Sequence, residues 1–161
     1  MIQAKLAFVA EGVTTDRDSN KVSAFNFCEN IEAESYPLTI QKIAFFCLWE
    51  RTAADPGRCG AEFSITHDGS DIVRQPVDID FEALLRCRCT IHVDGFTPQR
   101  PGTLVFRLAM PGHDSAEWVI TAGTTPVPAG SPRLGSAEGL RHIWDSGQLA
   151  TSMGTVNLHL R

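Results

Sequence analysis

The sequence predicts a mostly β fold, namely an antiparallel two-sheet sandwich of about eight strands in an immunoglobulin-like or C2-like Greek-key order. Apolar runs of about seven to twelve residues alternate with polar or Gly/Pro breaks, and the runs are rich in β-branched and aromatic residues. Within several runs, apolar and polar residues alternate with the period of a strand that is buried on one face. The expected strands span 2–10, 22–31, 39–50, 60–67, 71–79, 84–94, 103–110 and 116–122.

The clearest alternation is in 84–94. Its apolar face carries Leu85, Cys87, Cys89, Ile91 and Val93, and its polar face carries Arg86, Arg88, Thr90, His92 and Asp94. Residues 103–110 repeat the pattern, with Leu104, Phe106, Leu108 and Met110 opposite Arg107. Because the turn residues 98–102 join the two runs, we predict that they are neighbours in one antiparallel sheet.

Other segments give more local predictions. Residues 39–50 are apolar on both faces, which indicates a central strand or one whose outer face lies under the C-terminal segment. Asp68-Gly69 favours a type I′ hairpin, because both residues readily adopt positive φ. Residues 80–85 are compatible with one helical turn.

We predict a β-sandwich domain over residues 1–122, followed by a Pro/Gly-rich linker and C-terminal appendage over 123–161. In the appendage, Ser136 is a candidate cap for a short helix with an apolar stripe, before Gly147 ends it. The stripe consists of Leu140, Ile143 and Trp144. The weak alternation of 155–161 indicates an edge strand.

Composition excludes several classes of protein. A net charge of −5 and a pI near 5.5 argue against a nucleic-acid partner, which requires a clustered basic surface. No apolar stretch approaches the roughly 18 residues of a membrane span, and the first residues resemble a strand rather than a signal peptide. The five cysteines are an odd number, which favours reduced thiols and a cytoplasmic location.

Candidate metal sites have better structural explanations. Cys87 and Cys89 share a face, but that face is apolar and no second ligand pair exists, so we expect core packing. Residues 16–20, Asp-Arg-Asp-Ser-Asn, resemble the opening of a calcium loop. Lys21 and Phe27, however, occupy the positions that need Gly and Glu, so we expect a polar hairpin loop. Asp78 and Asp80 are too few for a site, and we predict no metal, cofactor or catalytic residue.

Basic side chains on the polar face of 84–94 are the candidate binding residues. They are Arg86, Arg88 and His92, extended by Arg107 on the strand that we expect beside them. Such a stripe on an acidic protein suits an acidic surface or a carboxylate ligand. The alternative is edge protection, since charged residues suppress pairing between sheet edges.

Three segments follow one another along the chain: Lys5-Leu6-Ala7-Phe8-Val9-Ala10-Glu11, Val22-Ser23-Ala24-Phe25-Asn26-Phe27 and Tyr36-Pro37-Leu38. With them, residues 4–122 resemble a family of small uncharacterised bacterial proteins. The family's members open with a strand ending in Ala-Glu or Ala-Asp, continue through a short second strand, and reach a proline before the third. The family's usual glycine-rich second strand is replaced here by residues 24–27. The resemblance implies a β-sandwich and a bacterial origin, and nothing about chemistry.

Two functions follow as hypotheses. The first is a non-catalytic binding or protein-interaction module, with a protein partner or self-association and without nucleic acid or membrane. The second is a small hydrolase or metal-dependent enzyme built from loop residues at one end of the sandwich. Its candidate residues are Asp16, Asp78, Asp80, His67 and His113. Convergence of these loops would favour the enzyme, whereas their dispersal over both ends would argue against it.

Overall fold

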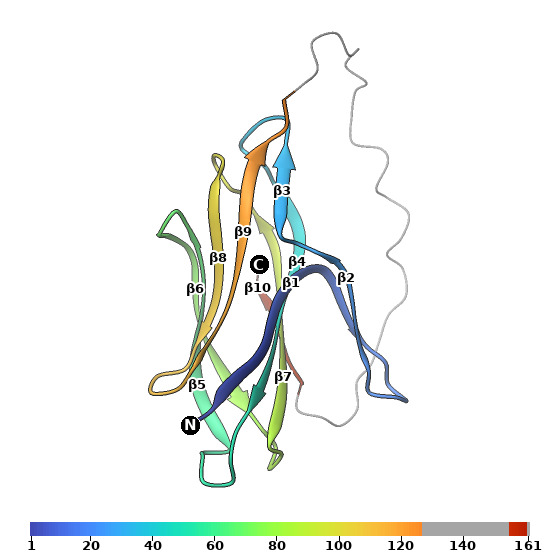
Figure 1. Cartoon of the computed structure of the whole chain (residues 1–161), viewed down its shortest axis with the longest axis vertical. Helices are drawn as coiled ribbons and strands as arrows, with labels where there is room; N and C mark the ends of the chain where they lie inside the picture. Colours follow the sequence, from blue (N-terminus) through green and yellow to red (C-terminus); the bar gives the residue numbers. More distant parts are fainter. Residues whose placement is uncertain (127–154, 161) are drawn as a thin grey trace.

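The computed structural model describes residues 1–126 and 155–160 of the 161-residue chain, and the described residues contain ten strands and no helix (Figure 1). The strands are β1 (Gln3–Thr15), β2 (Val22–Phe27), β3 (Asn30–Ala33), β4 (Ile40–Glu50), β5 (Arg58–His67), β6 (Ser70–Asp80), β7 (Arg86–Phe96), β8 (Gly102–Ala109), β9 (Ser115–Thr124) and β10 (Thr155–Leu160). None of the described segments is a helix able to cross a membrane.

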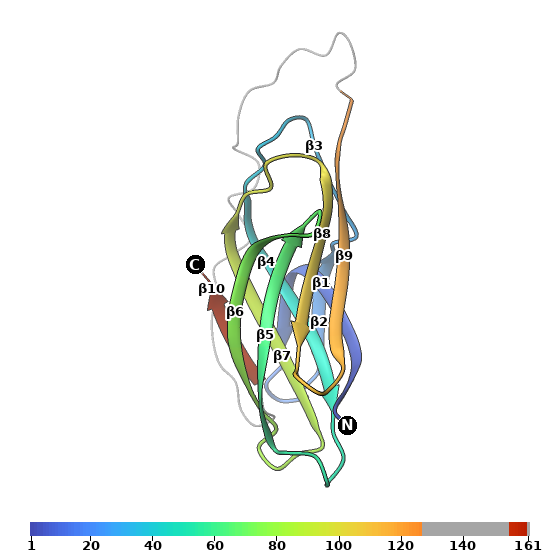
Figure 2. The same cartoon turned by 90° about the vertical axis from the view of Figure 1, so that its left-hand side faces the viewer.

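The strands form two five-stranded sheets packed face to face, and Figure 2 looks onto β6, β5, β8 and β9 of one sheet with the other sheet behind them. Sheet A has the order β10-β7-β4-β1-β2, and sheet B has the order β3-β9-β8-β5-β6. The predicted two-sheet sandwich is therefore confirmed. The central order β1-β4-β7 in one sheet and β9-β8-β5-β6 in the other is that of immunoglobulin-like sandwiches.

Between the sheets lies a single large core. Phe45 of sheet A packs against Phe63 of sheet B with ring centroids 5.6 Å apart, and Phe96 packs edge-on against Phe106. Trp49, Phe63 and Phe106 are completely buried. As predicted, β4 is the central strand of sheet A, and the apolar face of β7 from Cys87 to Val93 is part of the core.

One predicted neighbour relation is wrong: β7 and β8 do not pair. β7 lies between β10 and β4 in sheet A, whereas β8 lies between β9 and β5 in sheet B. The connection 97–101 therefore crosses from one sheet to the other, where the Pro98 carbonyl accepts a hydrogen bond from the Leu38 amide. Two half-buried strands have the same alternation whether they lie side by side or face each other across the core, so periodicity does not distinguish the arrangements.

Two predicted boundaries also differ. The expected strand 22–31 is split into β2 in sheet A and β3 in sheet B, which pairs in parallel with β9. The expected helical turn at 80–85 is instead a tight turn with positive φ at Glu82 and Ala83, closed by a 2.7 Å bond from the Leu84 amide to the Phe81 carbonyl. Because β7 begins only at Arg86, Leu85 is exposed and does not contribute to the core face.

Both predicted polar turns are present. Asp68 and Gly69 have φ of 48° and 80° and close the β5–β6 hairpin, as a type I′ turn requires. In the β1–β2 loop, one Asp16 carboxylate oxygen accepts bonds from the Ser19 amide and hydroxyl, at 2.6 and 2.7 Å. These bonds lower the pKa of Asp16 and hold the loop as a polar turn.

The β1–β2 hairpin arches over the outer face of sheet A (Figure 1). The two strands kink at Glu11 and Asn26, which are missing from the ladder; Asn26 has a φ of 54° and donates to the Glu11 carboxylate at 2.7 Å. Beyond the kink, apolar hairpin side chains pack against Phe8 and Phe46 of the sheet, whose rings stack at 4.8 Å. The hairpin residues are Val13, Val22 and Ala24.

At the other edge of sheet A, β10 pairs in parallel with β7, so 155–160 forms an edge strand as predicted. The proposed helix around Ser136 lies outside the described residues. The domain boundary near residue 122 stays a prediction.

Candidate functional site

The three sheet A candidates lie on the outward face of β7, and the arginines are already engaged. Arg86 Nε donates to the Glu50 carboxylate at 2.8 Å. Arg88 Nη1 donates to the backbone carbonyl and the side-chain oxygen of Asn20, at 2.8 and 3.0 Å, and so holds the tip of the hairpin arch. His92, four positions beyond Arg88 on the same strand, is partly buried. The guanidinium donors of Arg86 and Arg88 therefore hold groups within the fold.

Arg107 does not extend the stripe, because it lies on β8 in the other sheet. The expected adjacency rested on pairing between β7 and β8, which the structure contradicts. Arg107 instead projects from the outer face of sheet B, where it borders a groove of about 230 Å³. This groove is the candidate functional site.

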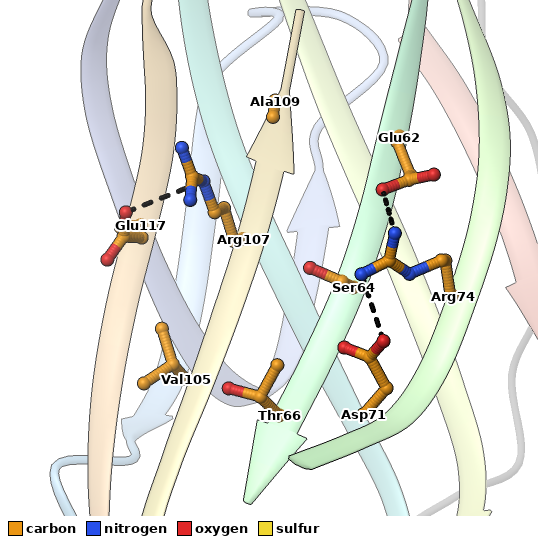
Figure 3. Close-up of a pocket in the computed structure, with 9 residues that line it drawn as sticks. All are labelled: Glu62, Ser64, Thr66, Asp71, Arg74, Val105, Arg107, Ala109 and Glu117. Atoms are coloured by element: carbon orange, nitrogen blue, oxygen red, sulfur yellow. Dashed lines mark ion pairs between the residues drawn. The ribbon is translucent and has the colours of Figure 1, made fainter. Parts of the chain in front are cut away.

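The groove runs along the strands of sheet B between two walls of charged side chains (Figure 3). One wall is the pair Arg107 and Glu117, from β8 and β9. The other is Arg74 of β6 between two carboxylates, Glu62 at 3.2 Å and Asp71 at 2.9 Å. The rest of the lining consists of small or short side chains: Ser64, Thr66, Val105 and Ala109.

Alternation places these side chains on one surface. In β5 the inward residues are buried and the residues between them point outward, and β8 follows the same rule. Register then sets them side by side, with Ser64 opposite Arg107 in the β5–β8 ladder and Arg107 opposite Glu117 in the β8–β9 ladder. Ser64 also pairs with Arg74 across β5 and β6. The β5–β8 and β5–β6 ladders thus place the two guanidinium groups on opposite sides of Ser64, as Figure 3 shows, and the β8–β9 ladder adds Glu117 beside Arg107.

Arg107 is the least engaged of the three predicted binding arginines. Its Nε lies 3.6 Å from the Glu117 carboxylate, which is beyond the 2.7–3.2 Å range of a hydrogen bond. Within the described residues, no hydrogen bond to its guanidinium is found, and its side chain is 52% exposed. A guanidinium presents five donors in a planar fork that matches a carboxylate, so Arg107 has the chemistry to take a carboxylate in two parallel bonds.

Loop residues of the enzyme hypothesis do not converge. His67 ends β5 beside the β5–β6 turn, whereas His113 lies in the β8–β9 turn at the opposite end of sheet B, where its Nδ1 accepts from the Ile2 amide at 3.3 Å. Asp80 ends β6 at the His113 end, and Asp16 is engaged in its own turn. Among residues 1–126 and 155–160, no cluster of three or more His, Cys, Asp or Glu side chains is arranged to hold a metal ion.

The five cysteines are thiols, and three are deeply buried. Cys47 and Cys89 stand opposite each other in the β4–β7 ladder, and both are fully buried. Burial, followed by the bond to Cys89, raises the pKa of the Cys47 thiol well above its ordinary value, and burial raises that of Cys87 to about 12. These groups pack as small apolar side chains, as the sequence predicts for Cys87 and Cys89.

Sequence reasoning identified Arg107 but missed the groove around it. Glu62, Ser64 and Thr66 alternate with apolar residues in the predicted strand 60–67, which was a usable signal for an exposed face. Arg74 and Glu117 gave no comparable signal, because only the strand order brings them to the same surface.

The arrangement defines an immunoglobulin-like sandwich with one open, charged sheet face. Comparison with models of protein families, with curated protein sequences and with solved structures finds no significant match to this chain.

Proposed function

We propose that the chain is a non-catalytic protein-interaction module that binds an acidic segment of a partner protein on the outer face of sheet B. One observation carries this proposal: Arg107 is exposed at the wall of a groove, without a hydrogen-bonded partner among the described residues. The five thiols further support a cytoplasmic location, where cysteines stay reduced.

An acidic partner segment suits this groove for two reasons. The floor of short side chains lets an extended segment approach the sheet, and the arginines on the two walls offer donors to carboxylates that project sideways from it. Glu62, Asp71 and Glu117 discriminate against segments of high negative charge, since they repel surplus carboxylates. We therefore propose a segment with one or two acidic residues among small or apolar ones.

Titration of the isotope-labelled full chain with a short peptide of alternating Glu and Val tests the proposal. Amide resonances of β5 and β8 around Ser64 and Arg107 are expected to shift, and the affinity is expected to fall with added salt. The variant Arg107→Gln should weaken binding about 10- to 100-fold, because a hydrogen bond to a charged group contributes about 1.5–3 kcal/mol.

Arg58→Gln is the matched control. Arg58, on β5, resembles Arg107 in being an exposed arginine beside a single carboxylate, Asp78 at 3.2 Å, but it does not line the groove. Its loss changes the net charge equally and should change the affinity less than twofold. Equal effects of the two variants would show that binding depends only on net charge. Resonance shifts confined to sheet A would show that the peptide binds elsewhere. Either result would overturn the proposal.

A further inference from the structure

The edge of β7 that does not pair with β4 is covered by β10, a segment from the far end of the chain. Residues 155–160 pair with residues 88–93 in parallel, from Thr155 opposite Arg88 to Leu160 opposite Val93. The apolar positions of the segment, 156, 158 and 160, stand in register with Cys89, Ile91 and Val93, the core-facing residues of β7. The two alternations are therefore in phase, as strand addition requires.

Without β10, β7 would be an unprotected sheet edge. The edge strand β6 of the other sheet carries Pro76 at mid-strand and several exposed charged residues, which are features that discourage pairing with another chain. Residues 89–91 of β7, in contrast, are Cys, Thr and Ile, all buried. Nothing in this part of β7 opposes the addition of a strand.

The connection that leads to β10 is long enough to reach more than one β7 edge. Residues 125–154 separate β9 from β10, whereas the next longest connection between strands, 51–57, has seven residues. Thirty residues can span up to about 100 Å, which is more than the dimensions of a small domain. The covalent link is therefore long enough to reach the β7 edge of a second copy.

We propose that the β7 edge is a strand-acceptor site, filled in cis by residues 155–160 and in trans by the same segment of a second copy, which gives a dimer with reciprocally exchanged strands. Each exchanged pair repeats the contacts of the closed monomer. The balance is therefore set by the effective concentration of the tethered segment, which we take as on the order of 1 mM. The chain is then monomeric at micromolar concentration and exchanges when crowded or refolded at high concentration.

A fluorescent peptide with the sequence of residues 153–161 tests the acceptor site on the full-length chain. Val156→Asp/Leu158→Asp places charges at the two positions in register with core residues and should release the cis segment, so that this variant binds the peptide. Asn157→Asp/His159→Asp adds the same two carboxylates at the alternating positions and should keep the site closed, like the wild-type chain. We expect at least tenfold tighter peptide binding to the first variant. Equal binding to all three chains, or none to the first, would overturn the acceptor site.

Refolding from urea at about 1 mM, followed by light scattering, tests the second copy as occupant. The wild-type chain and the Asn157→Asp/His159→Asp variant should give dimers, and mixed light- and heavy-isotope chains should give hybrids. The Val156→Asp/Leu158→Asp variant should remain monomeric; if it does not fold, Leu158→Ser serves in its place. Peptide binding without wild-type dimers would exclude the second copy. Because none of these variants touches Arg107, the outcome is independent of the proposed groove.

Discussion

Replacing Arg88 by Met should loosen the hairpin arch while leaving the two sheets intact. The side chain keeps its aliphatic length but loses the donor that holds the carbonyl and side-chain oxygens of Asn20 at 2.8 and 3.0 Å. Arg86 lies two residues away on the same face, but its partner is Glu50 on the neighbouring strand. Arg86→Met is therefore the matched control.

The magnitude follows from exposure. A hydrogen bond to a charged group contributes about 1.5–3 kcal/mol, and partial exposure of Arg88 lowers this to about 1–2 kcal/mol. The Arg86 side chain is 70% exposed, and such surface ion pairs contribute about 0.2–1 kcal/mol. Urea unfolding should therefore show a larger loss of stability for Arg88→Met. Its melting temperature should fall by about 2–8 °C.

Hydrogen exchange localises the effect. If Arg88 holds the arch, amides of residues 13–24 should exchange about 5- to 30-fold faster in Arg88→Met, while those of β4 and β5 keep the protection expected from global stability. Arg86→Met should leave the hairpin amides unchanged. Equal stability losses in the two variants, with unchanged exchange in the hairpin, would refute the role assigned to Arg88.

Phe46→Ala should lower the free energy of unfolding by about 3–5 kcal/mol although Phe46 faces outward from sheet A, because Phe46 is only 4% exposed and stacks on Phe8. The control Val119→Ala, on the open outer face of sheet B, should lower it by less than about 1 kcal/mol. Similar losses for the two variants in urea unfolding would contradict the burial assigned to Phe46. Gly102→Ala should destabilise the fold by about 1–3 kcal/mol, because a Cβ at this position would overlap His67 Nε2 and lie 2.6 Å from an Asp68 carboxylate oxygen. A melting temperature equal to that of the wild type would show that the turn can shift to accommodate the Cβ. The hydrogen bond from the Thr103 amide, followed by the charges of His67 and Arg100, lowers the pKa of Asp68 below its ordinary 3.8. The Asp68 carboxylate therefore stabilises the fold above pH 3.8, and this stabilisation is lost as the pH falls through the lowered pKa. The melting temperature of Asp68→Asn should decline less steeply between about pH 5 and 3 than that of the wild type, and parallel curves would argue against this role of Asp68. Burial, followed by Glu11, raises the pKa of Cys28 to about 11, so folded thiols should react with a disulfide reagent at neutral pH at least tenfold more slowly than thiols in urea.

Local sequence signals predicted the sandwich, the Asp68-Gly69 turn and the core face of β7, because each depends on residues close in sequence. Strand order depends on long-range pairing, so the sequence pattern did not reveal that residues 97–101 cross between sheets. The split of 22–31 falls at residues 28–29, close to Asn26, whose left-handed conformation is compatible with Asn but not required by it.

The candidate site was predicted only at Arg107. Its environment depends on three ladders that bring Arg74, Ser64 and Glu117 together, and no single strand contains that information. The apolar outer face of β4 was recognised, but the hairpin that packs on it was not, because the kink at Glu11 and Asn26 interrupts an otherwise ordinary strand pattern.

The parallel pairing of β10 with β7 also determines how the chain would respond to force. β10 runs upward in Figure 1 and the N-terminus lies at the lower end, so tension between the chain ends loads the six-residue ladder along its length. Its bonds then share the load instead of opening one by one. Once the ladder slips, residues 125–154 can extend by up to about 100 Å before the other strands bear the same tension. A stretching experiment would therefore record one abrupt lengthening when the ladder slips, as an event separate from the unfolding of the sandwich.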